Sequence, residues 1–132
     1  MKLHADKLDT HSISAYGEGW IAINGQRHTR SLVLASSGQL IDWPCSRLED
    51  LNAAHFSMLA SVMPEAPELV IFGSGSRLRF VPPSLLSGLM GQRIGVETMD
   101  TAAACRTYNI LASEGRRVVA ALLMESQMSL RP

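Results

Sequence analysis

The residues best suited to chemistry form a short loop rich in glycine and serine, which leads into two arginines. Its members are Gly73, Ser74, Gly75, Ser76, Arg77 and Arg79. Successive backbone N–H groups in a tight turn can surround an anion, and the guanidinium groups would add positive charge. The loop therefore predicts either a contact with a ligand or anion, or a structural turn that needs glycine for its backbone shape.

Three known loop signatures differ from this one. A dinucleotide-binding fingerprint needs a third glycine and a helix that starts directly after the loop, whereas residues 77–82 intervene here. A P-loop needs a Gly-Lys-Ser/Thr sequence, and a nucleophile elbow needs Gly-x-Ser-x-Gly, a frame in which Ser74 does not lie. These differences favour a structural turn over a ligand contact, and they argue against a catalytic serine.

No other group of side chains suggests catalysis or metal binding. The histidines lack metal-ligand spacing, and Glu49 with Asp50 fits the positive end of a helix dipole better than acid–base work. An ordered set of nucleophile, base and orienting group cannot be assembled from the sequence. We therefore expect no catalytic residue, no metal and no cofactor, and we favour a non-enzymatic role.

Composition and length describe one ordinary globular domain. The 132 residues include twelve acidic and twelve basic side chains, and 46% of the residues are hydrophobic. A formal charge of zero argues against the broad basic surface that nucleic acid requires, so we expect no nucleic-acid partner. We expect a single domain over residues 1–132, with an ordered core at about 11–122 and flexible ends.

The sequence also lacks a pattern for membrane insertion or targeting. No stretch approaches the ~20 consecutive apolar residues that a membrane-spanning helix needs. Residues 1–6 resemble neither a signal peptide nor a transit peptide. We expect a cytoplasmic protein, whose link to any membrane is indirect and runs through a partner.

The glycine loop follows an apolar segment that predicts a buried strand. Similar strands begin near residues 69, 93 and 117, with a helix predicted in each gap between them. This spacing predicts a βαβαβ unit whose three strands are neighbours in one mixed sheet. The helix over residues 101–113 has an apolar face that includes Ile110, and an outer face that we interpret as a partner surface. Arg106, Asn109 and Ser113 form that outer face.

The first third of the chain predicts a β-hairpin region. Asn24-Gly25 tolerates the positive φ angles of a type I′ turn, and it follows an apolar strand over residues 20–23. The second strand of the hairpin is expected to continue toward residues 32–34. Another short strand is expected over residues 40–43, where Pro44 ends it because proline cannot donate to a ladder.

Three weaker signals occupy the middle of the chain. Apolar residues with a helical period predict a helix over residues 48–63, with His55 on its buried stripe. Residues 78–81 predict a short edge strand after the glycine loop. A brief helix follows, and Gly91 is expected to end it as the residue after its last turn.

A set of motifs runs in a fixed order over roughly residues 11–122. The set consists of Tyr16-Gly17-x-Gly19-Trp20-Ile21, Asn24-Gly25, Asp42-Trp43, Leu69-Val70-Ile71-Phe72-Gly73-x-Gly75, Pro82-Pro83, Ile94-x-Val96-Glu97, Asp100-Thr101, Ala104, Thr107-Tyr108-Asn109, Leu111, Glu114-Gly115-Arg116 and Ala120-Ala121. It resembles a family of small domains of unknown function that includes the mitochondrial assembly factors for respiratory NADH:ubiquinone oxidoreductase. Without an organelle-targeting extension, the chain is similar to the free-standing bacterial members.

This resemblance implies a three-layer α/β fold with a mixed sheet, which agrees with the β-hairpin region and the C-terminal βαβαβ unit. The mitochondrial members look like non-enzymatic assembly proteins. The resemblance therefore implies a protein-binding or assembly module, whose partner would be a component of a membrane respiratory complex. The alternative is a small-ligand or anion-binding protein, or an enzyme, that uses the Gly73–Arg79 loop.

Cys45 and Cys105 are predicted to be free thiols, because they show no metal-ligand spacing and we expect a reducing compartment. Thiol titration of unfolded protein, purified without oxidant and not reduced, should find two free thiols. A count of zero would show instead that the two cysteines form a disulfide.

Overall fold

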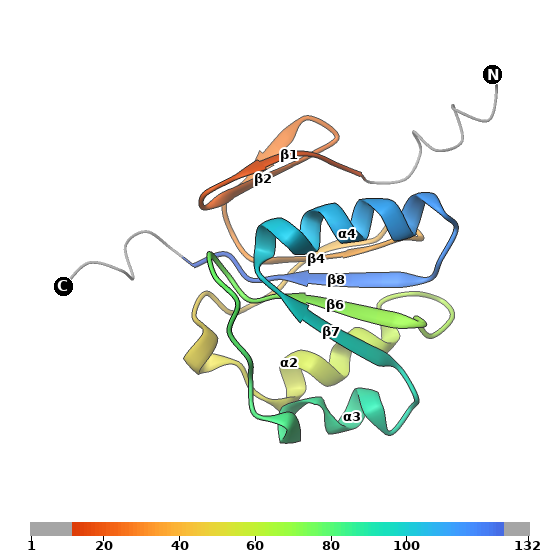
Figure 1. Ribbon diagram of the computed structural model, residues 1–132. Coiled ribbons are helices and arrows are strands. Elements are labelled where there is room, and N and C mark those ends of the chain that lie inside the picture. Colours follow the sequence, from red (N-terminus) through yellow and green to blue (C-terminus); the bar gives the residue numbers. More distant parts are fainter. Residues whose placement is uncertain (1–11, 126–132) are drawn as a thin grey trace.

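The computed structural model describes residues 12–125, and Figure 1 shows the arrangement of their strands and helices. The strands are β1 Ile13–Gly17, β2 Trp20–Ile23, β3 Gln26–His28, β4 Leu32–Ala35, β5 Leu40–Asp42, β6 Leu69–Gly73, β7 Gly95–Met99 and β8 Val118–Leu122. The helical segments are η1 Leu48–Asp50, α2 Ala53–Ser57, η2 Met58–Ser61, η3 Pro83–Leu86, α3 Ser87–Met90 and α4 Thr101–Ser113. No helix within residues 12–125 is long and apolar enough to cross a bilayer. Of the ends that we expect to be flexible, residues 1–11 and 126–132 lie outside the described residues.

β6 is the middle strand of the parallel part of a five-stranded sheet, whose order is β5-β4-β8-β6-β7. It pairs in parallel with β7 on one side and with β8 on the other, while β4 runs antiparallel to both β8 and β5. Val70, Ile71 and Phe72 are completely buried, as expected for a strand that is covered on both faces. The predicted mixed sheet with three neighbouring strands is confirmed.

Two layers cover the sheet. α4 lies on one face with the small sheet β1-β2-β3 beside it, and α2 and α3 lie on the other face (Figure 1). Side chains of β6 alternate between two apolar clusters: Val70 and Phe72 pack with Phe56 of α2, whereas Ile71 packs with Tyr108 of α4. The expected three-layer α/β fold is confirmed.

The Asn24-Gly25 hairpin is confirmed, but its second strand is shorter than expected. Asn24 has a φ of 51° and Gly25 a φ of 86°, and β2 pairs with β3 across this turn. β3 ends before residues 32–35, which form β4 in the larger sheet. The chain changes sheets at the buried Ser31, whose Oγ accepts the backbone N–H of Met124 at 2.7 Å.

The helix predicted over residues 48–63 is wrong in extent, because η1, α2 and η2 take its place. Asn52 interrupts it: the Asn52 side chain accepts the backbone N–H of His55, and Nδ1 of the His55 ring accepts the backbone N–H of Asn52. This capping box starts a new helix at Ala53. His55 is therefore a half-buried capping residue, and the prediction that it is a core residue is wrong.

Two local predictions around α3 are also wrong. Residues 78–81 form no strand. Gly91 has a φ of −65°, and the left-handed position that ends the helix belongs to Arg93, with a φ of 63°. The backbone N–H of Ile94 donates to the Leu89 carbonyl at 3.1 Å, which closes the turn as a glycine usually would.

α4 begins and ends where the sequence predicts, but one of its faces differs. Asp100 caps the helix by accepting the backbone N–H of Ala103 at 2.8 Å. Cys105 is completely buried, whereas Ile110 is 57% exposed, so the prediction that Ile110 belongs to the buried face is wrong. The buried stripe of α4 is set by the positions that touch β6, β8 and β1.

Both cysteines of the described chain are free. Burial raises the pKa of the Cys105 thiol to about 12, so very little thiolate exists there at neutral pH. Cys45 is only partly buried, and burial raises its pKa as well. Neither thiol has the lowered pKa of a reactive cysteine.

Asn109 of α4 attaches the small sheet to the rest of the protein. Its Oδ1 accepts the backbone N–H of Ile13 at 3.1 Å, and its Nδ2 donates to the Ile13 carbonyl at 2.7 Å. One side chain thus satisfies both backbone groups of a residue in β1, as a neighbouring strand would. Arg106, one turn earlier, donates to the Tyr16 hydroxyl at 3.1 Å.

Replacing Asn109 with Ala should weaken this attachment, because two partly buried backbone groups of β1 lose their partners. We expect a loss of about 1–3 kcal/mol in the free energy of unfolding, measured by urea denaturation. Hydrogen exchange should accelerate first in β1 and β2. Ser113→Ala is the matched control, since in the described part of the chain the Ser113 hydroxyl donates only to the Ile110 carbonyl of its own helix. Equal exchange rates in the two variants would contradict this role of Asn109.

Candidate functional site

The glycine loop lies at the carboxyl end of β6, and the hydroxyl of its first serine, Ser74, is hydrogen-bonded within the protein. Ser74 is completely buried. Its Oγ accepts the backbone N–H of Arg79 at 2.9 Å, and it lies 2.8 Å from the Arg77 carbonyl and 3.2 Å from the Met99 carbonyl, to which it can donate. The hydroxyl therefore shapes the turn between residues 74 and 79.

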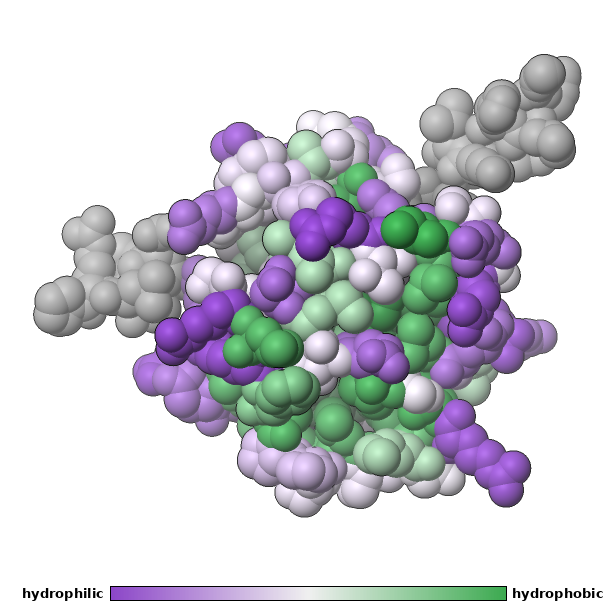
Figure 2. All heavy atoms as spheres, in the orientation of Figure 1, coloured by the Kyte–Doolittle hydropathy of each residue, from purple (hydrophilic) through white to green (hydrophobic). Residues whose placement is uncertain are grey.

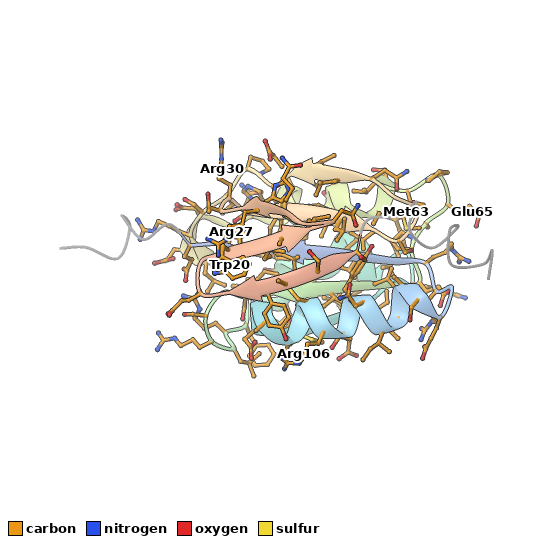
Figure 3. The ribbon with its side chains drawn as sticks, turned by 90° about the horizontal axis from the view of Figure 1, so that it is seen from above. Trp20, Arg27, Arg30, Met63, Glu65 and Arg106 are labelled. Atoms are coloured by element: carbon orange, nitrogen blue, oxygen red, sulfur yellow. The ribbon has the colours of Figure 1, made fainter. Side chains whose placement is uncertain are left out.

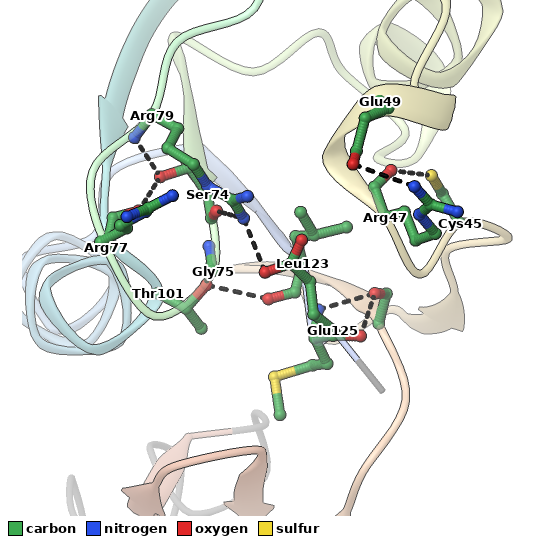
Figure 4. A network of polar contacts seen from close by, with 12 residues as sticks. Cys45, Arg47, Glu49, Ser74, Gly75, Arg77, Arg79, Thr101, Leu123 and Glu125 are labelled. Carbon is green, nitrogen blue, oxygen red and sulfur yellow. Dashed lines mark hydrogen bonds and ion pairs between the residues drawn. The ribbon is translucent and has the colours of Figure 1, made fainter. Parts of the chain in front are cut away.

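Gly75 connects the loop to the start of α4. Its backbone N–H donates to Oγ1 of Thr101 at 2.9 Å, and its carbonyl accepts the backbone N–H of Thr101 at 2.8 Å. The Thr101 hydroxyl then donates to the Leu123 carbonyl at 3.0 Å, just beyond β8 (Figure 4). Gly75 has a φ of 105°, a left-handed conformation that favours glycine.

The two arginines of the loop differ completely in environment. Arg79 turns inward, where its Nη2 lies 2.7 Å from Oε1 of Glu125 and 2.7 Å from the Ser74 carbonyl (Figure 4). The side chains of this ion pair are 23% and 16% exposed. Arg77 is exposed, and within residues 12–125 its guanidinium forms no ion pair or hydrogen bond.

Ser74 also lies at the carboxyl end of the parallel strands, where an α/β protein commonly holds a ligand. The chain leaves β6 toward α3 on one face and leaves β7 toward α4 on the other, so the connections separate at this edge (Figure 1). Such a switch point usually opens a crevice between the two strand ends. Here the backbone N–H of Ser74 donates to the Met99 carbonyl at 2.8 Å, which continues the pairing of the two strands by one residue.

A cavity of about 360 Å³ lies at this end of the sheet. The glycine loop, the start of α4 and the chain after β8 form one side of it, and the turn between β1 and β2 forms the other. Its polar lining includes Glu18, Ser76, Thr101 and Glu125, among mainly small and apolar neighbours. The structure thus places Gly75 and Ser76 in the wall of a cavity. The polar side chains of Ser74 and Arg79 instead bond to other groups of the chain.

The second set of predicted residues lies on α4, away from the glycine loop. Asn109 and Arg106 contact β1, and the Ser113 hydroxyl bonds to its own helix. Figure 3 shows Arg106 projecting from α4 beside the small sheet, where Arg27 stacks over the ring of Trp20 at 3.9 Å. The structure therefore brings Arg106 and Asn109 together with the protein's own β1.

Two exposed apolar side chains next to the loop were missed by the sequence analysis. Leu78 is 52% exposed and Phe80 is 69% exposed. They alternate with Arg79, which turns inward, so the segment has an outer apolar side and an inner charged side. The alternation is visible in the sequence, but it suggested an edge strand, because nothing local shows that the arginine is the anchored residue.

Comparisons with known proteins agree on one family. Residues 13–123 match the family described as "Protein of unknown function (DUF498/DUF598)". A protein of Rhodobacter capsulatus, named only as uncharacterized, is 35% identical over 111 residues, which are 84% of this chain and 82% of that protein. A Francisella tularensis protein named "13 kDa major membrane protein" is 24% identical over 78% of this chain and 82% of its own length.

The chain is also similar to animal proteins of defined name. "NADH dehydrogenase (ubiquinone) 1 alpha subcomplex assembly factor 3" of Xenopus tropicalis is 28% identical over 127 residues, 96% of this chain. The chain spans 68% of the length of that protein and 59% of the length of its Bos taurus namesake.

Solved structures of bacterial proteins share the fold. A crystal structure from Bordetella parapertussis is 39% identical with a TM-score of 0.82, covering 88% of this chain and 97% of that one. A solution structure from Bordetella pertussis, described as a Mth938-like domain, is 34% identical with a TM-score of 0.75, covering 92% and 91%. The three-layer architecture described above is therefore that of the Mth938-like domains.

Replacing Arg79 with Ala should destabilise the protein, whereas replacing Arg77 with Ala should not. Arg79→Ala leaves the carboxylate of Glu125 and the Ser74 carbonyl without a shared donor in a largely buried place. We expect it to lower the free energy of unfolding by about 1.5–3 kcal/mol, and Arg77→Ala to change it by less than about 0.5 kcal/mol. Urea denaturation of both variants measures the difference. Equal stabilities would show that the ion pair does not hold the loop.

Proposed function

The chain belongs to the family of proteins of unknown function DUF498/DUF598, and from that membership we propose that it is a protein-binding assembly module that performs no chemistry. Its partner would be a component of a membrane respiratory complex. The animal relatives are named as assembly factors of NADH dehydrogenase, which supports this class of partner. We propose the same role, as an assembly factor, for this chain.

The outward display of Leu78 and Phe80 is the observation that carries the proposal. Both side chains belong to an irregular segment, and a phenylalanine that is 69% exposed loses contact with water only when a partner covers it. The inward Arg79 ion pair fixes the backbone between them. Aromatic residues, phenylalanine among them, are enriched at protein interfaces relative to the rest of the surface.

The bonding of the glycine loop supports the same conclusion. Ser74, Gly75 and Arg79 donate to or accept from groups of their own chain. Groups that are already paired would have to exchange these partners to hold a substrate, at a cost of about 1–3 kcal/mol for each buried group. The loop therefore serves better as a support for the segment that follows it.

A second candidate function is the binding of a small ligand in the cavity beside the loop. The volume of about 360 Å³, with Gly75 and Ser76 in its wall, favours it. Arg77 is the exposed cation nearest in sequence to this wall. Chemical-shift perturbation with phosphate, nucleotides and common metabolites tests this function, and changes centred on residues 73–79 would support it.

We propose that the protein lies in the cytoplasm and binds there to the surface of a membrane complex. The Francisella relative is named as a membrane protein, so association with membranes is consistent with the family. In this chain we attribute such association to the bound subunit. Cell fractionation with and without the respiratory complex would distinguish attachment through the complex from attachment to lipid.

The double variant Leu78→Ser/Phe80→Ser should lose its partner while it remains folded. Truncated anchors at the centre of an interface typically cost at least about 2 kcal/mol, which corresponds to about 30-fold weaker binding. Affinity capture from native cells, read by mass spectrometry, should recover subunits of a respiratory complex with the wild type and far less with the variant.

Ile41→Ser is the matched control, because Ile41 is an exposed apolar residue of β5, at the opposite edge of the sheet from β7. It should capture as much partner as the wild type. Recovery of the same subunits with the Leu78/Phe80 variant would contradict the proposed surface. Recovery of no respiratory subunit with any form would contradict the assembly role.

A further inference from the structure

β7 forms an open edge of the five-stranded sheet. Within residues 12–125 it pairs only with β6, and its other side faces outward, nearest the viewer in Figure 1. The strand covers five residues, whereas β5 at the opposite edge covers three. An open edge of this length can accept a further strand by backbone hydrogen bonding.

The hydrogen bonds with β6 define which backbone groups of β7 point outward. The Gly95 N–H donates to the Glu68 carbonyl at 3.2 Å, and the Met99 carbonyl accepts the Ser74 N–H at 2.8 Å. Backbone groups alternate in direction along a strand, so Gly95, Glu97 and Met99 face β6. Val96 and Thr98 direct their N–H and C=O groups to the open side.

These outward groups have no partner within residues 12–125. Neither side chains nor loops bond to the N–H or C=O groups of Val96 and Thr98. Two donors and two acceptors are therefore available in the order that a neighbouring strand would use. The neighbouring loop at residues 74–79, in contrast, satisfies its own groups.

The side chains of β7 give this edge an acidic centre. Val96 packs with the cluster beside α2 and α3, and Met99 packs with the cluster beside α4. Glu97 lies between them, exposed, and within the described chain it has no ion-pair partner. Figure 2 shows apolar side chains gathered over the lower half of this face, where η3, α3 and β7 lie.

We propose that β7 accepts an extended segment of a partner protein as a sixth strand, and that this segment carries a lysine or arginine opposite Glu97. The new strand would bond to the outward N–H and C=O groups of Val96 and Thr98. A cation across from Glu97 gives a favourable cross-strand pair, whereas an acidic residue there is repelled. Exposed charge on an edge strand thus selects the partner as well as limiting self-association.

A second copy of this chain fits the edge less well. A two-fold antiparallel pairing centred on Glu97 would use the free groups of Val96 and Thr98. It would also place the two Glu97 carboxylates directly opposite each other, about 4.5–5.5 Å apart at Cβ, which is destabilising. Charge complementarity therefore favours a basic segment of another protein.

This inference rests on the proposed protein-binding role, but it concerns a different surface from Leu78 and Phe80. Its test uses defined peptides and no cell extract. The probe is a blocked peptide of alternating valine and threonine with one arginine at its centre, and a second peptide has glutamate in place of that arginine. Binding is followed by two-dimensional amide NMR of the labelled full chain.

The arginine peptide should shift the amide signals of Val96 and Thr98 and slow their hydrogen exchange. It should bind about two- to twenty-fold more tightly than the glutamate peptide, the range for a favourable against a like-charge cross-strand pair. Glu97→Lys should reverse that preference. No change at Val96 and Thr98, or equal affinity for the two peptides, would overturn the proposal.

Thr98→Pro removes one outward N–H and should abolish binding of the arginine peptide. The fold should tolerate proline there, because the Thr98 N–H does not bond to β6. Thr98→Ala keeps the N–H and is the matched control, which should bind as the wild type does. Glu97→Lys provides the test if the proline variant fails to fold.

Sedimentation of the wild type without peptide tests whether a second copy of the chain binds at the β7 edge. A dimer that Thr98→Pro converts to a monomer would show that a second copy occupies the edge, and it would overturn the proposal. If the peptide experiment fails while respiratory subunits are still captured through Leu78 and Phe80, this inference fails alone. If the peptides bind as expected while capture fails, the assembly role fails instead.

Discussion

The hydroxyl of Thr101 joins the three segments on which the fold depends. It accepts a hydrogen bond from the loop after β6 and donates one to the chain after β8, while its own residue begins α4. Gly73 makes the close approach possible, because a Cβ there would lie 3.0 Å from the Cα of Thr101. A buried amide or carbonyl without a partner costs about 1–3 kcal/mol, so this one side chain stabilises the meeting point of strand, loop and helix.

The consequence for function is a division between an inner and an outer side of the same loop. Ser74 and the ion pair of Arg79 with Glu125 draw the polar groups inward and fix the backbone. The residues that alternate with Arg79, Leu78 and Phe80, are thereby turned toward solvent. A sequence that resembles an anion-binding loop therefore fixes a segment that exposes two apolar side chains, the surface for which we propose a protein partner.

The family match begins in β1 and ends just after β8, so the layered fold as a whole is the shared unit. The small sheet belongs to it because Asn109 bonds to both backbone groups of Ile13. Aromatic packing completes the other layer, where Trp43, Phe56 and Phe72 meet edge to face with ring centroids 5.2–5.9 Å apart. Trp43 is buried in this cluster, and its Nε1–H donates to the His55 carbonyl at 3.1 Å.

The sequence by itself determined the parallel strands, the helix from Thr101 to Ser113 and the Asn24-Gly25 turn, because these depend on local signals. Continuous apolar runs, an Asp cap and residues that tolerate positive φ are sufficient for each. Only the tertiary structure decided the rest. Asn52 and His55 form a capping box that starts a new helix inside the segment predicted as one helix. Arg79 forms its ion pair with Glu125, which is distant in sequence.

At the candidate site, too, the local sequence did not reveal the long-range contacts. The sequence located the glycine loop and the outer residues of α4, but it could not show that Ser74 and Asn109 are bonded to their own chain. Their partners, Met99 and Ile13, are distant in sequence and come close only when the layers pack. Local pattern therefore identifies polar residues outside the apolar core, whereas long-range hydrogen bonding decides whether those residues remain available to another molecule.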